Sequence, residues 1–263
     1  MNRFDDENKI ISDFQNVKDG EVLFVTQSSI SEDVYHSIHT KTLWDKWINS
    51  SGKSDPPPDY YLIDEELMMD VMRVDDHAFM DAKGKVQNPT NVGESKLYNE
   101  LKNSGILELF PNAEPIINAK TMLPTEQDHN YMRYRSNFER VVSEHIKKIP
   151  LYQQNHPRYK TILFVMDESS AYVQIKGEKL DMNKVQVDEI VEAKPHLFFW
   201  DSSFVDVFWK SGVDFLIWYA PYKLLRTTSG LFELPKVAIF DCGADRVENI
   251  TDYDSDKMCS SEL

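Results

Sequence analysis

The chain has 263 residues, of which 44 are acidic and 29 are Lys or Arg, so its formal net charge is −15; 41% of the residues are hydrophobic. This composition is typical of a folded globular protein and excludes a disordered tail. No apolar run approaches the roughly 20 residues that span a bilayer, and the first residues, MNRFDDENK, lack the apolar stretch of a signal peptide. With only two cysteines, the chain is expected to be a cytoplasmic protein without disulfides.

The first half of the chain contains short predicted elements. Residues 21–27 are predicted to form a strand, and loosely helix-periodic apolar residues predict a helix over 32–49. Residues 67–74 fit a strand or a helix, and the polar clusters on both sides favour the strand. A short helix is predicted after Ser95, with Gly105 ending it in a left-handed conformation.

The clearest predicted element is an amphipathic helix over residues 125–149. Thr125 and Asp128 have the spacing of a capping box, and Pro150 follows the predicted end. Apolar and aromatic residues recur at steps of three or four along it, which is the spacing of one helix face. This stripe comprises Tyr131, Tyr134, Phe138, Val141 or Val142, Ile146 and Ile149.

Four short apolar runs in the last third predict buried strands at 161–166, 196–200, 214–220 and 236–240. Residues 201–212 between the second and third runs predict a crossover helix, and hence a right-handed strand–helix–strand unit. The fold class predicted is therefore α/β, or α+β, with a mixed, partly parallel sheet in the C-terminal half, flanking helices and a long central helix.

The chain is expected to form one domain over residues 1–263. A subdivision into an acidic α+β half, 1–124, and an α/β half, 125–263, is the alternative. Residues 252–263 are polar and are expected to be frayed.

Acidic residues follow three of the predicted strands directly. Asp167 and Glu168 follow the first strand, Asp201 the second and Asp241 the last. If these strands are parallel neighbours, the carboxylates converge at one sheet edge, where hard oxygen ligands suit Mg²⁺ or Mn²⁺. Asp167, Glu168 and Asp201, with Asp70 from the predicted strand 67–74, are the candidate metal ligands. The alternative is that each acid only caps a following helix.

The central helix is the main basic element of an acidic chain. His129, Arg133 and Arg140 lie near one face of it, and Arg133 and Arg140 are the candidate phosphate-binding residues. They make this helix a candidate nucleic-acid contact, although salt bridges to the protein's own carboxylates would explain the same residues. His129 is also a candidate for proton transfer.

Lys194 is a second candidate for proton transfer. The triplet Glu192-Ala193-Lys194, downstream of Asp167, resembles the Glu-x-Lys pattern of restriction-endonuclease-like nucleases, in which acids hold Mg²⁺ and the lysine positions water. The resemblance covers fewer than 30 residues. Acid-x-Lys triplets also begin at Glu7, Asp81, Glu94 and Glu100, so the pattern identifies no family.

Residues 55–81 form a second acidic region, with nine acids and one base. In it, Asp75, Asp76 and His77 place three metal-binding side-chain types in a row. Adjacent side chains of a regular strand point to opposite faces, so a solvated charge run is the favoured interpretation. This region would also suit a protein partner.

Two functions remain open from the sequence. One is a divalent-metal-dependent phosphodiester hydrolase, nuclease-like, with Asp167 and Glu168 as main ligands and Mg²⁺ or Mn²⁺ as cofactor. The other is a non-catalytic acidic module, such as an inhibitor or a nucleic-acid mimic, that binds another protein through residues 55–81.

Overall fold

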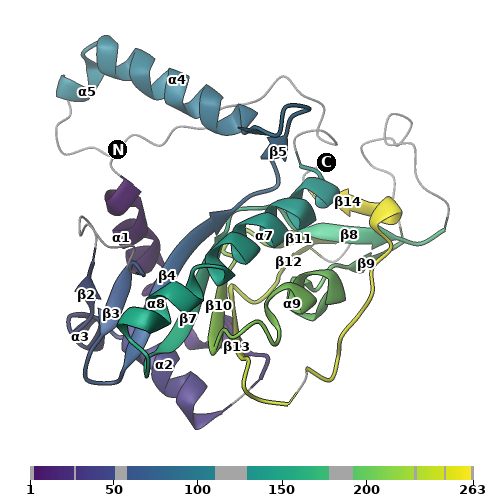
Figure 1. The fold of residues 1–263 in the computed structure, drawn as a ribbon. Coiled ribbons are helices and arrows are strands. Elements are labelled where there is room, and N and C mark those ends of the chain that lie inside the picture. Colours follow the sequence, from purple (N-terminus) through teal and green to yellow (C-terminus); the bar gives the residue numbers. More distant parts are fainter. Residues whose placement is uncertain are drawn as a thin grey trace.

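The computed structural model describes residues 3–26, 28–50, 58–109, 129–177, 192–227, 230–245 and 247–261. Its centre is a seven-stranded mixed sheet in the order β1-β13-β10-β7-β4-β3-β2, with helices on both faces (Figure 1). The chain is thus a mixed α/β protein, and strands from both halves of the sequence form the sheet. The expectation of a sheet confined to the C-terminal half is wrong, because β1 to β4 lie before residue 75. The strands are β1 (Val22–Phe24), β2 (Ile48–Asn49), β3 (Tyr60–Leu62), β4 (Leu67–Val74), β7 (Lys160–Asp167), β10 (Phe215–Tyr219) and β13 (Val237–Asp241).

Strands β4, β7 and β10 are parallel, whereas β13 runs antiparallel to β10. The expectation that the strands ending in acids are parallel neighbours is therefore wrong, because β10 separates β7 from β13 and the two run in opposite directions. Asp241 pairs with Phe215 at the start of β10, at the opposite sheet edge from Asp167. The apolar run 196–200 is not a strand: Phe198–Trp200 forms a short 3-10 helix, and Asp201 then caps α9 (Ser202–Phe208).

Alternate residues of the central strands pack against different helix layers. On β7, Leu163 and Val165 belong to the core beneath the helices α7 and α9, whereas Ile162 and Phe164 belong to the core beneath α1 and α2. Both faces are covered, which explains why the strands appear in the sequence as unbroken apolar runs rather than as alternating patterns.

The long helix is bent and lies later in the sequence than predicted. It comprises α7 (Tyr131–Ile146), capped by the Asn130 side chain, and α8 (Ile149–Asn155). Pro150 does not end the helix but lies in the first turn of α8, where a missing N–H costs no hydrogen bond. The proposed cap residues Thr125 and Asp128 lie outside the described residues.

The remaining elements lie outside the seven-stranded sheet. No helix in the described ranges is long and apolar enough to cross a membrane. Strand β4 matches the predicted 67–74, and Gly105 has a φ of 74°, as predicted. Residues 258–260, within the segment expected to be frayed, pair with β8. These elements are α1 (Arg3–Phe14), α2 (Ser29–His39), α3 (Lys41–Trp44), α4 (Pro89–Asn103), α5 (Ile106–Leu109), β5 (Phe79–Met80), β6 (Val86–Gln87), β8 (Tyr172–Ile175), β9 (Ala193–Pro195), β11 (Leu224–Thr227), β12 (Gly230–Glu233) and β14 (Met258–Ser260).

The packing of α7 on the sheet yields a test of the core. Phe138 has no exposed surface and stacks on Trp218 with ring centroids 4.5 Å apart. Phe138→Ala should lower the free energy of unfolding by about 3–5 kcal/mol in urea titrations, because a buried aromatic leaves a cavity. The matched control is Phe232→Ala at a half-exposed position of β12, which should change it by less than about 1 kcal/mol. Equal effects of the two substitutions would contradict this packing.

Candidate metal centre

The turn that follows β4 places Asp76 and His77 in non-strand conformations. Strand β4 ends at Val74, and the Asp75 Oδ1 atom accepts backbone N–H groups from His77 at 3.0 Å and Ala78 at 2.7 Å. This side-chain-to-backbone turn ends the alternation of a strand. Asp76 and His77 are therefore not forced to point to opposite faces, as neighbouring residues of a regular strand are.

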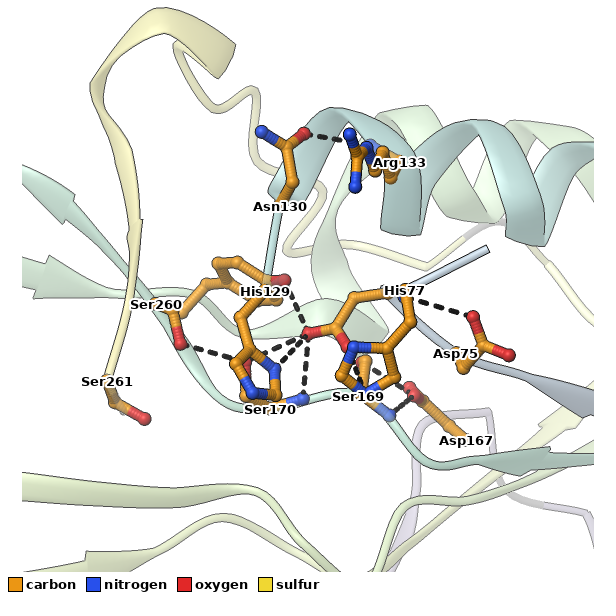
Figure 2. Close-up of polar contacts among 12 residues, drawn as sticks. Asp75, His77, His129, Asn130, Arg133, Asp167, Ser169, Ser170, Ser260 and Ser261 are labelled. Carbon is orange, nitrogen blue, oxygen red and sulfur yellow. Dashed lines mark hydrogen bonds and ion pairs between the residues drawn. The ribbon is translucent and has the colours of Figure 1, made fainter. Parts of the chain in front are cut away.

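His129 reaches the same place from the other side, just before Asn130 at the start of α7. Its Nδ1 atom lies 3.3 Å from Asp76 Oδ2, and His77 Nε2 lies 3.5 Å from Asp76 Oδ1. The two imidazole rings are in edge contact, with centroids 4.7 Å apart. Figure 2 shows both histidines beside Ser169 and Ser170, below the start of α7.

One ligand atom each from Asp76, His77 and His129 lies within 4.8 Å of the other two. Donor atoms around one zinc ion, at metal–ligand distances of about 2.0–2.2 Å, lie no more than about 4.4 Å apart. Small side-chain rotations would thus complete the site. Among the described residues, no other three His, Cys, Asp or Glu side chains lie this close together.

The Asp76 carboxylate is wholly buried, and its two oxygens have different surroundings. Oδ2 accepts hydrogen bonds from Ser170 N at 3.1 Å, Ser170 Oγ at 3.0 Å and Tyr172 OH at 2.6 Å. Oδ1 accepts no hydrogen bond in the described part of the chain. Burial alone would raise the pKa of Asp76, but the hydrogen bond and charge of His129 and the hydrogen bond from Tyr172 outweigh it and lower this pKa to about 2.

This donor set has a defined metal preference. Two imidazoles and one carboxylate are the ligands of catalytic zinc sites that keep a position open, and of several Mn²⁺ and Fe²⁺ sites. Both histidine side chains keep about a sixth of their surface exposed, so solvent reaches the group.

Both carboxylate oxygens of Asp167 are engaged by side chains and backbone groups in the protein interior. It has no exposed surface and accepts hydrogen bonds from Tyr134 OH at 2.5 Å and Trp218 Nε1 at 2.9 Å. Its other oxygen accepts from Ser169 N and Oγ, and Lys223 Nζ lies 3.2 Å from Oδ2. All these partners belong to the protein.

Glu168 and Asp201 lie in separate networks. Glu168 forms a two-pronged ion pair with Arg73 at the surface. Asp201 accepts from Ser203 N at 2.9 Å as the cap of α9, and its Oδ2 lies 2.8 Å from His196 Nε2. The helix-capping alternative therefore accounts for Asp201.

Asp70 lies farther along the sheet. It pairs with Leu163, four residues before Asp167, which corresponds to about 13 Å along the strands. Its Oδ2 atom lies 2.5 Å from His145 Nδ1 and accepts from Tyr152 OH at 3.1 Å. The structure thus does not bring the four acids chosen as metal ligands into one site.

The arginines chosen as phosphate ligands also have partners within the protein. The Arg133 guanidinium lies 4.6 Å from the ring centre of Phe79. Arg140 donates to Asn137 Oδ1 and lies 3.6 Å from Glu144. Arg133 is one turn from His129 along the chain, whereas Arg140 is two turns farther on.

Lys194 lies on β9, with its Nζ 4.5 Å from the ring centre of Tyr253, and takes no part in the metal-ligand group. Of the residues chosen from the sequence, His129 alone belongs to that group. The alternation of a regular strand argues against Asp76 and His77 as neighbouring ligands and favours a solvated charge run, but β4 ends at Val74, before both residues. The signal that identifies them is the Asp75 turn.

Several acids of residues 55–81 are engaged inside the molecule rather than with solvent. Asp70 and Asp76 are buried, Asp59 accepts from Val71 N at 2.7 Å, and Asp75 forms the turn described above. Asp55 lies outside the described residues. Fewer acids than the sequence suggests therefore remain for a protein partner.

Comparisons of the chain with protein-family models, with curated proteins and with solved structures find no significant match. The functional assignment therefore rests on geometry and chemistry alone.

A carboxyl pair away from the metal centre yields a test of pH dependence. Asp59 and Asp70 are hydrogen-bonded to each other, which requires a shared proton. Burial, together with the negative charge of Asp70, raises the pKa of Asp59 to about 8. Between pH values of about 4 and 8 the folded state then binds more protons than the unfolded state, so this pair makes stability fall as pH rises.

Asp59→Asn should remove that dependence, because an amide can donate to Asp70 and accept from Val71 without titrating. The expected result is that the variant gains stability relative to wild type as pH rises from about 5 to 8, measured by urea titration at several pH values. Asp64→Asn, in the exposed turn between β3 and β4, is the control. Its free energy of unfolding should change with pH in the same way as that of wild type. A constant difference between Asp59→Asn and wild type would contradict the shared proton.

Proposed function

We propose that this protein binds a divalent transition-metal ion through Asp76, His77 and His129 and uses it to hydrolyse phosphodiester bonds. The observation that carries the proposal is the buried Asp76 carboxylate. It is held through Oδ2, which also lies 3.3 Å from His129 Nδ1, whereas Oδ1 lies 3.5 Å from His77 Nε2 and accepts no hydrogen bond in the described part of the chain. A buried, ionised oxygen without a hydrogen bond costs several kcal/mol unless a cation satisfies it.

The expected ion differs from the Mg²⁺ suggested by carboxylates alone. Imidazole nitrogens favour Zn²⁺ or Mn²⁺, whereas Mg²⁺ prefers oxygen ligands and keeps much of its water. A bound divalent ion would polarise a phosphoryl oxygen and lower the pKa of water. Arg133, one turn along α7, supports phosphodiesters as the substrate class, because guanidinium groups pair well with phosphate oxygens.

Metal binding is the first test. Chelator-treated wild-type protein should bind one Zn²⁺ or Mn²⁺ ion per chain in calorimetric titrations and Mg²⁺ more weakly. Asp76→Asn, His77→Gln and His129→Gln should each weaken binding by about 100-fold or more, since even indirect partners of metal ligands contribute about 10–100-fold. His36→Gln, at an exposed histidine of α2, is the control and should bind as wild type does. A wild-type protein that binds neither ion would overturn the proposal.

Hydrolysis is the second test. The protein loaded with Zn²⁺ or Mn²⁺ should cleave bis(p-nitrophenyl) phosphate, and both a chelator and Asp76→Asn should abolish cleavage. Arg133→Gln should raise KM more than it lowers kcat, because an arginine that holds substrate contributes mainly to binding. Arg140→Gln is the matched control, about 10 Å farther along the helix axis. Metal binding without cleavage would leave a metal site but refute the phosphodiesterase activity.

A further inference from the structure

A second layer of side chains holds the Asp76 carboxylate in place. Ser170 donates to Asp76 Oδ2 through both its backbone N–H and its hydroxyl group, and it also contacts Ser260 Oγ at 3.0 Å. The orientation of Asp76 thus depends on the position of Ser170. Figure 2 shows Ser170 beside Ser169, with Asp167 next to them and Ser260 on the opposite side.

Lys223, from the connection between β10 and β11, fixes this pair of serines. Its Nζ atom donates to the Ser170 carbonyl oxygen at 3.0 Å and to Ser169 Oγ, and it lies 3.2 Å from Asp167 Oδ2. The ammonium group also lies 4.3 Å from the ring centre of Tyr134. The lysine is 4% exposed. It therefore acts as a charged link between β7, α7 and the turn that carries Ser170.

A lysine in contact with a serine hydroxyl can activate that serine as a nucleophile. The burial of Ser169 excludes this role for Lys223 and Ser169. Ser169 has no exposed surface, and its hydroxyl group donates to Asp167 Oδ1 at 2.6 Å. A substrate has no route to it. We therefore assign Lys223, Ser169 and Asp167 a role in fixing the turn that carries Ser170, not a role in a reaction.

We propose that Lys223, paired with Asp167, is a positioning residue that sets the affinity of the metal centre through Ser170. This inference rests on the proposed function. A buried ion pair contributes little net stability compared with apolar residues of the same size, so stability alone does not account for a lysine at this position. Its specific contribution is the hydrogen bond to Ser170 O, which fixes the donors that orient Asp76.

The test separates positioning from stability. Lys223→Met keeps the length of the side chain but removes the donors and leaves Asp167 charged and buried, which destabilises the fold. The double variant Lys223→Met/Asp167→Asn removes both charges and should regain much of the lost stability in urea titrations. Both variants should bind Zn²⁺ about 10–100-fold more weakly than wild type in calorimetry. With Co²⁺ as a probe, the visible absorption spectrum should also change, since it reports ligand geometry.

Lys236→Met is the matched control. Lys236 forms an ion pair with Glu21 at 2.6 Å near the surface, and its loss should leave Zn²⁺ affinity unchanged. If wild type binds no metal, the proposed function fails and this inference fails with it. If wild type binds and the double variant binds equally well, only the role of Lys223 is overturned. The role is overturned as well if neither Lys223 variant folds, because Lys223 would then serve the fold as a whole.

Discussion

The structure depends on one bent helix that brings hydrogen-bond donors to three buried aspartates, and on the histidine just before it, which reaches a fourth. His129 precedes α7 and contacts Asp76, and Tyr131 donates to Asp201 at 2.5 Å. The other three donors lie farther along the bent helix. They are Tyr134 to Asp167, His145 to Asp70 and Tyr152 to Asp70. An isolated buried carboxylate costs several kcal/mol, so these contacts couple the position of the helix to the stability of the interior.

These four networks differ in one respect that bears on function. Asp167 and Asp201 accept hydrogen bonds from the protein on both oxygens, whereas His145 and Tyr152 both contact Oδ2 of Asp70. At Asp76 the donors gather on a single oxygen, and two histidines that remain partly exposed face the carboxylate. A buried acid is thus a weak functional signal by itself. A buried acid is a much stronger functional signal when one of its oxygens accepts no hydrogen bond and lies beside partly exposed side chains.

Much of the fold was predictable from the sequence, because the central strands are covered on both faces and therefore show as continuous apolar runs. Such runs predict β7, β10 and β13, whereas β4 is indicated by the polar clusters on both sides of residues 67–74. The same reasoning failed at residues 196–200, where an equally apolar run forms a 3-10 helix: an apolar segment of five residues shows burial but not conformation. The direction of each strand could not be predicted either, because the antiparallel pairing of β13 with β10 depends on tertiary contacts that the local sequence does not encode.

The candidate site was harder to predict, since it depends on contacts between residues far apart in the chain. The stripe Tyr131, Tyr134 and Phe138 correctly predicted a helix face that packs on the core. Its two hydroxyl groups also implied buried acceptors, and that second signal was missed. Which acid meets which tyrosine depends on the packing of α7 over the sheet, which local patterns do not encode.

The spacing of these donors along α7 and α8 has a consequence for folding fidelity. A helix that docks through apolar contacts alone can slide by one turn, about 5.4 Å, at modest cost. Here such a slip would break the hydrogen bonds from Tyr131 to Asp201, from Tyr134 to Asp167 and from His145 to Asp70 at once. These hydrogen bonds therefore favour a single register of the helix on the sheet. The two histidines beside Asp76 come together only in that register.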